Sequence, residues 1–568
     1  MLHKGSLYLS IALAGSLVLS SCSKLGDLSA DNFTVTPSPL EAVSGQVPVT
    51  INGRFPEKYM KKKAVVTVIP VLRYQGGEAK GQPATFQGER VLGNNQEISY
   101  KVGGNYTMRN TFTYQPAMQQ SELYLTFDAR VGNKTVKVNP VKVANGVIAT
   151  SMLVGRTAAS SNMALGEDAY QYAIAQTQQA QIRYLINQAN IRTSELKSVS
   201  VQDFLGTLRQ IKNDQKGYQL DNIEISAYAS PEGSLQFNTQ LAEKRQNSSE
   251  GYVRGELKKV DMDADINTRY TAEDWEGFQE LVQASNIQDK DVILRVLSMY
   301  SDPEEREQQI RNLSAGFKEL ADEILPELRR ARLTINYNII GRSDDEIQAQ
   351  YKADASKLSI EEVLYAATLT DNAAEKKDIY TTATRLYPND YRAYNNLATL
   401  AIAEGNLTAT EKYLSQAAEK NANAPEINAN RALLALAKGN ISQVETYAAR
   451  ATTAKNYNEV IGNLHIFTGN YAQAAQSLKG CKTNSAALAQ ILAKDYAAAA
   501  QTLANVPNQD ATTSYLKAIV AARTNNNSAV LSNLRDAFAK DASFKAMAAK
   551  DLEFAALFGD AAFQNLVR

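Results

Sequence analysis

Few side chains in this sequence belong to the types that carry out nucleophilic, imidazole or metal chemistry. The 568 residues include two cysteines, Cys22 and Cys481, and two histidines, His3 and His465. These numbers exclude a disulfide framework and a zinc site built from cysteine and histidine. His465 and Cys481 are close enough in sequence to form a catalytic pair, but no orienting Asn or Asp and no electropositive setting accompanies them. We therefore expect a protein that is not an enzyme and holds no metal or cofactor.

The charge balance indicates no general affinity for polyanions. Lys+Arg and Asp+Glu are both 60, so there is no net field to attract nucleic acid, and no nucleic-acid partner is expected. With 44% hydrophobic and 21% charged residues, the composition is that of a globular protein. The length suggests about three or four domains.

The first cysteine follows what reads as a secretory signal. Lys4 precedes an apolar run over residues 7–19, and small residues come directly before Cys22. The run has the length of a signal-peptide core and is too short for a spanning helix. Leu19-Ser20-Ser21-Cys22 resembles the lipobox of bacterial lipoproteins. The resemblance implies that residues 1–21 are removed and that Cys22 carries diacylglycerol; the alternative is an ordinary signal with an incidental cysteine.

The residues after this cysteine predict a short tether. Residues 22–32 are mostly small and polar, as expected between a lipid and a domain. Residues 23–27 contain no acidic cluster of the kind that sends lipoproteins of some bacteria to the cell surface. We therefore expect a protein of the outer membrane, on its periplasmic face rather than at the cell surface.

The region 33–150 has the pattern of short strands. Apolar and polar residues alternate, Val, Thr and Tyr are frequent, and Gly, Asn and Pro separate the segments. Residues 131–134 are a plausible hairpin turn. The pattern predicts an all-β sandwich, which we interpret as a spacer or protein-binding module, with strands in the segments 47–53, 64–74, 97–102, 111–116 and 121–138.

The region 165–342 predicts an α+β domain. Strand candidates at 181–186 and 223–228 flank a helix over 199–213. The loop 229–234 then leads into a second helix. This order of strands and helices is typical of a sheet with helices on one face.

This region resembles the carboxy-terminal domain family of OmpA, which binds the peptide stem of peptidoglycan. The turn Asn187–Arg192 after the first strand and the block from Phe237 to Arg245 match the family's motifs. Arg329–Tyr337 resembles its closing edge strand. Residues from about 259 to 328 make the domain longer than the family minimum, and we predict that they form a helical insertion.

The family holds the diaminopimelate unit of the stem with an Asp and, fifteen residues later, an Arg. A zwitterionic head group needs an anion for its ammonium and a guanidinium fork for its carboxylate. Arg245 keeps the family's Arg, but Ser230 stands at the Asp position. Glu232 could reach the same ammonium, and Asn238 belongs to the same motif, so the resemblance makes these four residues the peptidoglycan-binding candidates. The alternative is a docking module in which Arg245 merely pairs with Glu232 or Glu243.

The region 355–568 is built from repeats. Asp371-Asn372 and three Gly-Asn pairs beginning at Gly405, Gly439 and Gly469 recur at spacings of 34, 34 and 30 residues. A fixed period of this size predicts a solenoid. The series resembles tetratricopeptide (TPR) repeats, which implies paired helices and a protein partner.

Individual residues can be placed on this repeat frame. Asn395, Asn396 and Thr399 fall on the exposed, concave side of a first helix, where we expect a partner to bind. His465 falls at a packing position of a first helix, and Cys481 at a small packing position of a second helix. Both are interpreted as core residues.

The sequence thus predicts an all-β sandwich, an α+β OmpA-like domain and an all-α TPR-like solenoid. The expected function is a lipid-anchored protein that links the outer membrane to peptidoglycan and recruits a protein partner. The alternative is an accessory scaffold of an outer-membrane assembly, secretion or appendage complex, whose OmpA-like domain no longer binds peptidoglycan.

Overall fold

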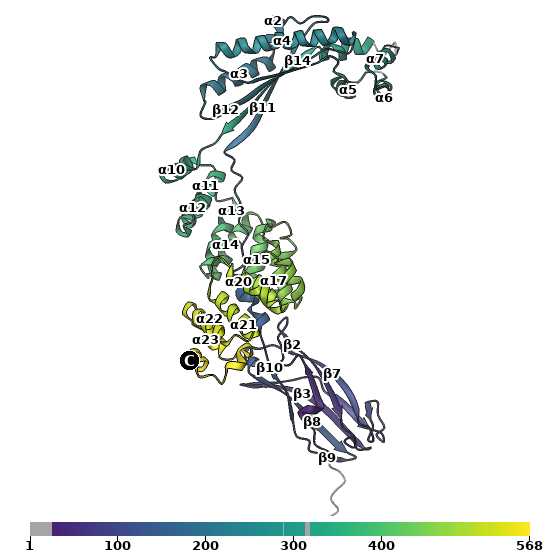
Figure 1. Ribbon diagram of the computed structural model, residues 1–568, viewed down its shortest axis with the longest axis vertical. Coiled ribbons are helices and arrows are strands. Elements are labelled where there is room, and N and C mark those ends of the chain that lie inside the picture. The colour runs from purple at the N-terminus through teal and green to yellow at the C-terminus, as the bar shows by residue number, and fades with distance from the viewer. Residues whose placement is uncertain (1–24, 288, 313–317) are drawn as a thin grey trace, which may run out of the picture. The chain divides into compact units, whose positions relative to one another are not determined.

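The computed structural model describes residues 25–287, 289–312 and 318–568 (Figure 1). Cys22, His3 and the predicted signal lie outside the described residues. The chain divides into two compact units. One unit combines residues 1–167 with residues 371–568, and the other consists of residues 168–370. The N-terminal and C-terminal parts of the chain therefore belong to the same unit, with the second unit inserted between them.

The N-terminal region is β-rich, as predicted. One sheet has the strand order β1-β2-β7, and the other has the order β10-β8-β3-β5-β6, with β4 on β3 and β9 on β8. Val49 and Ile51 of one sheet and Val66 and Leu123 of the other share one core, so the sheets form a sandwich. The strands are β1 (Phe33–Thr36), β2 (Gln46–Phe55), β3 (Ala64–Tyr74), β4 (Gly77–Lys80), β5 (Ala84–Gly88), β6 (Gln96–Ile98), β7 (Gly104–Thr113), β8 (Ser121–Val131), β9 (Lys134–Val136) and β10 (Val141–Gly146).

The predicted alternation is clearest in β2, where buried and solvent-facing residues alternate along the strand. The turn at residues 131–134 joins β8 to β9. Between β10 and residue 167 lie the 3₁₀ turn η3 (Thr150–Leu153), the short helix α1 (Val154–Ala159) and a segment without helix or strand.

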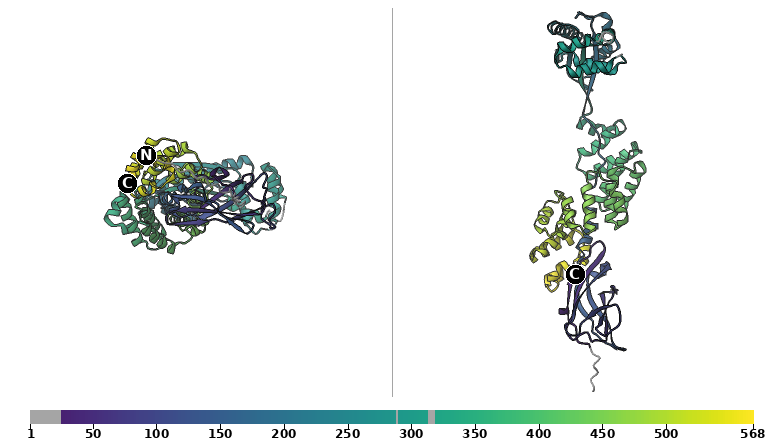
Figure 2. Two further views of the ribbon diagram at one scale, coloured as in Figure 1. Left: turned by 90° about the horizontal axis from the view of Figure 1, so that it is seen from below. Right: turned by 90° about the vertical axis from the view of Figure 1, so that its right-hand side faces the viewer.

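The C-terminal region is a helical repeat region, as predicted, in which successive helices form antiparallel pairs that stack (Figure 2). Gly405, Gly439 and Gly469 end helices with φ values of 73°, 75° and 79°, a left-handed conformation that favours glycine. The repeated Gly-Asn pairs therefore mark helix ends. The helices are α12 (Ala373–Leu386), α13 (Tyr391–Ala403), α14 (Leu407–Lys420), α15 (Pro425–Ala437), α16 (Ile441–Ala448), α17 (Tyr457–Phe467), α18 (Tyr471–Ser477), α19 (Asn484–Leu492), α20 (Tyr496–Ala504), α21 (Ala511–Arg523), α22 (Asn527–Lys540), α23 (Ser543–Ala548), η7 (Leu552–Leu557) and α24 (Ala561–Val567).

The second unit is built around a sheet of order β11-β14-β12-β13. Its strands are β11 (Ala173–Arg183), β12 (Tyr218–Tyr228), β13 (Ile266–Thr271) and β14 (Arg330–Ile340). Phe204 and Leu208 of α3 pack with Ile225 and Leu333 of the sheet, so this helix covers one face. The helical elements are α2 (Thr193–Leu196), α3 (Val199–Asn213), α4 (Leu235–Lys259), α5 (Trp275–Ala284), α6 (Lys290–Met299), α7 (Pro303–Arg311), the π-helical turn η4 (Leu320–Ile324), α9 (Leu325–Leu328), α10 (Asp344–Asp354), η5 (Ala355–Lys357), α11 (Ile360–Ala366) and η6 (Ala367–Leu369).

Two local predictions for this unit were wrong, and a third was incomplete. The first strand ends at Arg183 rather than beginning near residue 181. The strand that begins at Arg330 is not at an edge, because β14 pairs with β11 on one side and β12 on the other. The predicted helical insertion contains β13, which pairs in parallel with β12. The short alternation in residues 266–271 was hidden between helical segments. The compact unit also extends to Thr370, into the predicted repeat region.

Candidate functional site

Arg245, the central peptidoglycan-binding candidate, is fully buried on α4. Its Nε donates to the carbonyl of Gln188 at 3.0 Å, Nη1 to that of Tyr228 at 2.8 Å and Nη2 to that of Leu185 at 3.2 Å. The guanidinium thereby joins the loop after β11 to the end of β12. The predicted ion pair with Glu232 or Glu243 is not what holds it, because main-chain oxygens accept its hydrogen bonds.

Burial lowers the pKa of Arg245 to about 10, so the side chain keeps its charge at neutral pH. A buried cation is stable only when hydrogen bonds compensate its lost hydration. The three carbonyl oxygens supply that compensation within the protein. A stem-peptide carboxylate would have to displace at least one of them.

Ser230 and Glu232 lie together in the loop after β12. The Ser230 hydroxyl donates to Glu232 Oε1 at 2.8 Å. Arg329 binds the same carboxylate with both Nε, at 2.9 Å, and Nη2, at 3.0 Å. Arg311 Nη2 donates to the main-chain oxygen of Glu232 at 2.8 Å. The anion expected to meet a ligand ammonium therefore already forms a two-bond pair with a guanidinium.

Asn238 is also turned inward. It is buried, and its Nδ2 donates to the carbonyl of Gly233 at 3.0 Å. The structure thus brings Ser230, Glu232 and Asn238 into one loop-and-helix region, and each has a partner in the protein. Sequence reasoning missed the role of Arg329, although an arginine-rich start of the last strand was a signal that could have found it.

A second buried ion pair supports the same loop. Arg330 Nη2 lies 3.0 Å from Asp274 Oδ2, and both side chains are almost fully buried. The amide of Asp274 donates to the carbonyl of Ala229 at 3.3 Å, and its side chain caps α5 through Gly277. The segment that begins with α5 is therefore attached directly to the loop that carries Ser230.

In the first unit, the expected concave surface of the solenoid is covered by the protein's own chain. Helix α1 contacts α15, α17 and α19, and the segment that follows it bonds to residues of α13, α15 and α17. In Figure 1 this blue segment lies among the green and yellow-green helices. We call residues 160–167 the groove segment. Ser161 and Ala164 of this segment are buried.

Asparagine side chains hold the main chain of the groove segment. Asn396 accepts from the amide of Gly166 at 2.7 Å and donates to its carbonyl at 2.9 Å. Asn430 makes the same pair of bonds to Ala164, at 2.7 and 2.8 Å. Each side-chain amide therefore pairs with one residue's N–H and C=O, the bonding pattern of a strand partner.

The series continues at both sides of these two asparagines. Asn395 Nδ2 donates to the Ala164 carbonyl at 2.9 Å, and Asn456 Nδ2 to the Asn162 carbonyl at 2.8 Å. The main-chain groups bound belong to residues 162, 164 and 166, which face the same way in an extended chain. Further along, Asn463 and Ser485 bind the Ser161 hydroxyl.

The prediction of an exposed binding surface at Asn395, Asn396 and Thr399 was therefore wrong for the two asparagines, which are buried beneath the groove segment. Thr399 is half-buried and donates to the carbonyl of Asn396 in its own helix at 2.8 Å. Sequence reasoning missed Asn430. The signal that could have found it is its separation from Asn396, which equals the 34-residue repeat period.

A buried carboxylate lies beside the same segment. Glu459 is 2% exposed and accepts from Asn162 Nδ2 at 3.2 Å and Thr483 Oγ1 at 3.4 Å. Burial raises its pKa to about 7. Cys481 shares a pocket of about 560 Å³ with Glu459, and burial together with this carboxylate raises the pKa of the thiol to about 11. A thiol with a raised pKa is a poor nucleophile.

His465 lies on a helix, whereas Cys481 does not. His465 is half-buried on α17, as a first helix of a pair. Cys481 does not lie on a helix, because α18 ends at Ser477 and Gly480 has a φ of 85°. The interpretation of Cys481 as a helix residue was wrong, since the glycine breaks the helix before it.

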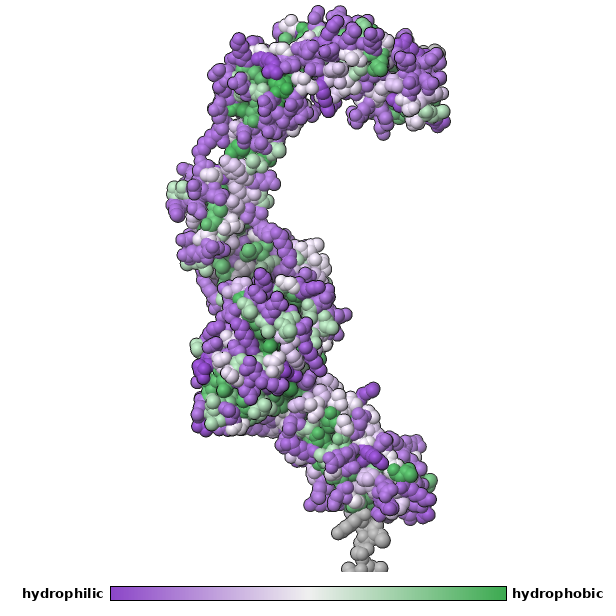
Figure 3. Space-filling model, in the orientation of Figure 1, coloured by the Kyte–Doolittle hydropathy of each residue, from purple (hydrophilic) through white to green (hydrophobic). Residues whose placement is uncertain are grey.

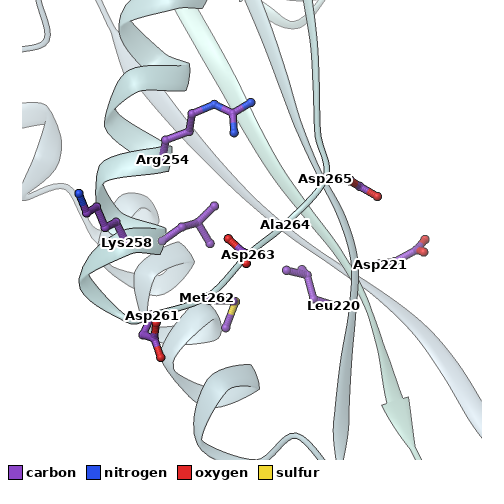
Figure 4. Close-up of a pocket in the computed structure, with 10 residues that line it drawn as sticks. Leu220, Asp221, Arg254, Lys258, Asp261, Met262, Asp263, Ala264 and Asp265 are labelled. Atoms are coloured by element: carbon purple, nitrogen blue, oxygen red, sulfur yellow. The ribbon is translucent and has the colours of Figure 1, made fainter.

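A separate pocket of about 610 Å³ lies in the second unit, between the end of α4 and the loop before β13 (Figure 4). Arg254 and Lys258 line it together with Asp221, Asp261, Asp263 and Asp265. Figure 4 shows these carboxylates pointing in different directions. Within the described residues, no group of three or more His, Cys, Asp or Glu side chains is arranged to hold a metal ion.

No protein-family model and no curated protein matches this chain. Among solved structures, a tetratricopeptide repeat protein from Parabacteroides merdae is 13% identical with a TM-score of 0.27, and the match covers 41% of this chain and 94% of that one. Pseudomonas aeruginosa pilF is 15% identical with a TM-score of 0.24, over 39% of this chain and 98% of that one. Yeast Tom70 is 10% identical with a TM-score of 0.23, over 66% of this chain and 91% of that one. At these TM-scores the similarity carries no argument about function.

Proposed function

We propose that this protein is a lipid-anchored, non-catalytic scaffold of the outer membrane. Its external protein partner binds the outer helices of the solenoid, and its OmpA-like domain is a docking module rather than a grip on the cell wall. The observation that carries the proposal is that both predicted ligand sites are saturated by the protein itself. Main-chain oxygens surround Arg245, and the groove segment covers Asn395 and Asn396.

The outer helices of the solenoid offer a surface that the groove segment does not use. Lys412 and Ser415 of α14 and Thr446 of α16 are exposed. The face of the molecule shown in Figure 3 is largely hydrophilic, with small groups of hydrophobic residues. Such a surface suits a partner that binds through polar contacts around a few apolar anchors. Among the described residues, no helix is long and apolar enough to cross a membrane.

Site-specific photocrosslinking in cells tests where the partner binds. A photoreactive residue replaces Lys412, Ser415 or Thr446 on the outer helices, and Thr399 serves as the matched position on the inner side. We expect intermolecular products from the outer positions, while Thr399 gives products within the chain. Partner products from Thr399 alone would show that the groove is open to partners.

Two further measurements test the membrane and wall parts of the proposal. Radiolabelled palmitate should enter the wild-type chain but not a Cys22→Ser variant, and the variant should leave the outer-membrane fraction. The amount of full-length chain that sediments with purified sacculi should not exceed the amount of a control protein that has no affinity for the cell wall. Specific sedimentation would support the link to peptidoglycan that the OmpA resemblance implies.

A further inference from the structure

The first described residues of the chain lie at one end of the β-sandwich. Leu25 and Leu28 pack against the sandwich core. A Cβ atom placed on Gly26 would lie 3.6 Å from Cδ2 of Tyr59. Tyr59 belongs to the loop that joins β2 to β3. The chain therefore enters the sandwich beside this loop.

Four loops meet at that end. The amide of Lys58 donates to the carbonyl of Tyr100 at 2.7 Å, and the amide of Arg90 donates to that of Lys62 at 2.7 Å. The amide of Gly132 donates to the carbonyl of Lys63 at 2.9 Å. These bonds tie residues 88–95, 99–103 and 130–134 to residues 56–63. We call the four segments the basic loop cluster.

The basic loop cluster is strongly positive in a chain that is neutral overall. Its acidic side chains are Glu57, which lies 3.5 Å from Lys58, and Glu89, which lies 4.0 Å from Lys62. Lys63, Lys101 and Lys134 are exposed. The eight basic side chains of the cluster are Lys58, Lys61, Lys62, Lys63, Arg90, Lys101, Arg130 and Lys134.

Two apolar side chains project from the same loops. Leu92 is 102% exposed and Val102 is 71% exposed, so both are among the most exposed large hydrophobic residues of the described chain. Surfaces that lie in a lipid interface combine exposed aliphatic residues with lysines and arginines. Cationic side chains bind phosphate groups, and aliphatic ones enter the boundary between head groups and acyl chains.

The length of chain outside the structure sets the distance to the membrane. Cys22 precedes Leu25 by three residues, which span at most about 10 Å when extended. A lipid on Cys22 would therefore hold this end of the sandwich at the level of the head groups. At the other end of the sandwich, β2 begins at Gln46, close to Ser44. The Ser44 hydroxyl donates to the carbonyl of Phe467 in the solenoid at 2.8 Å.

We propose that the basic loop cluster is a second membrane contact, which binds the head groups of anionic phospholipids while Leu92 and Val102 enter the interface. This inference rests on the proposed lipid anchor at Cys22. The two contacts together orient the sandwich, with the cluster on the bilayer and the solenoid at the other end of the strands. A strand of the length of β2 spans about 33 Å, so the sandwich is a spacer between the bilayer and the solenoid.

A vesicle sedimentation assay with the mature chain that lacks the lipid anchor tests the basic loop cluster separately from the anchor. The chain begins at Ser23 and is mixed with vesicles of phosphatidylcholine alone or of phosphatidylcholine and phosphatidylglycerol in a three-to-one ratio, at low salt. We expect binding to the anionic vesicles and none to the neutral ones. Equal binding to both would overturn the proposal, and so would an absence of binding to either.

Matched variants assign the binding to the loops. Replacing Lys63, Lys101 and Lys134 together by Gln should weaken binding to the anionic vesicles at least tenfold. Replacing the exposed Lys80, Arg109 and Lys142 by Gln removes the same charge from other strands of the sandwich and should change binding less than twofold. Equal losses in the two triple variants would contradict the proposal. Leu92→Ser should weaken binding without changing its salt dependence.

Two controls separate the alternatives. Inorganic phosphate at matched ionic strength should not release the bound chain; release would assign the cluster to free phosphate and overturn the membrane contact. Palmitate labelling of the precursor tests the anchor independently. If labelling fails while the vesicle results hold, the lipid-anchor proposal falls and the membrane surface stands on its own. If labelling succeeds while vesicle binding fails, the reverse conclusion follows.

Discussion

Arg245 of the second unit and Asn430 of the solenoid both bind main-chain groups in places where a ligand was expected. They differ in how far along the chain those groups lie. Arg245 binds carbonyls 17, 57 and 60 residues away, at the end of β12 and in the loop after β11. Asn430 binds a residue 266 positions away, in a segment that precedes the whole second unit.

This difference shows two ways in which side chains that could bind a ligand instead bind the protein's own main chain. The Arg245 site is closed by neighbouring loops and belongs to one compact unit. The groove that Asn396 and Asn430 line is closed by a distant segment, residues 160–167. This contact joins residues 1–167 and 371–568 into one unit. Ordering such a distant segment costs conformational entropy, which its many hydrogen bonds and its buried helix α1 offset.

The largest expected effect is at Arg245. Arg245→Ala leaves three buried carbonyls without their donor and removes a large buried side chain, which should lower the local free energy of unfolding by about 3–5 kcal/mol. Hydrogen exchange measured by mass spectrometry on the full chain should show faster exchange in β12 and α4. Lys244→Ala, at the exposed neighbouring position, is the control. Equal exchange in the two variants would show that the guanidinium is not structural.

The next effect distinguishes the two sites by pH. Arg245 keeps its charge across the neutral range, whereas burial raises the pKa of Glu459 from 4.5 to about 7. The folded protein thus retains this proton to higher pH than the unfolded chain. Stability contributed at Glu459 is therefore fully present below about pH 4.5 and declines by up to about 3 kcal/mol as the pH rises from there through 7.

Thermal unfolding between about pH 5 and 8 measures this dependence. Asp551, whose pKa burial raises to about 6, contributes in the same direction, so the comparison must be made with Glu459→Gln. This variant should show a smaller loss of stability with rising pH than the wild type. Parallel pH profiles for the two proteins would exclude Glu459 as the titrating group.

A smaller effect is expected in the asparagine groove. Asn430→Ala removes both bonds to Ala164 and should cost about 2 kcal/mol. Hydrogen exchange should increase in residues 160–167 while the second unit is unaffected. Thr399→Ala, on the same side of the solenoid but bonded within its own helix, should change stability by less than about 0.5 kcal/mol. Similar losses from both substitutions would mean that the groove segment is held by apolar packing instead.

The smallest effect is expected at Ser230. Ser230→Asp introduces the residue that the resemblance to the OmpA family implies here, but it places a second carboxylate beside Glu232, which Arg329 already neutralises. We expect a destabilisation of about 1 kcal/mol and no gain in sacculus binding. Sedimentation of the variant with sacculi, next to wild type, measures this. A clear gain would show that the region still accepts a stem peptide.

Local patterns in the sequence predicted much of the fold. Alternation in residues such as those of β2 indicated the sandwich, and the Gly-Asn pairs indicated the helix ends of the repeats. Predictions failed where pairing partners decide the outcome. The strand that begins at Arg330 has the pattern of any half-buried strand, and only its neighbours β11 and β12 make it central.

By itself, the sequence determined many of the strands and helices, because periodicity and glycine positions act over a few residues, but it did not indicate β13. It also placed Ser230 and Glu232 in one loop and Arg245 on the helix that follows this loop. The tertiary structure decided what these side chains bind. Arg329 reaches Glu232 across 97 residues, and the groove segment reaches Asn396 across 230. Contacts of this range depend on how whole elements pack, and no local pattern specifies them.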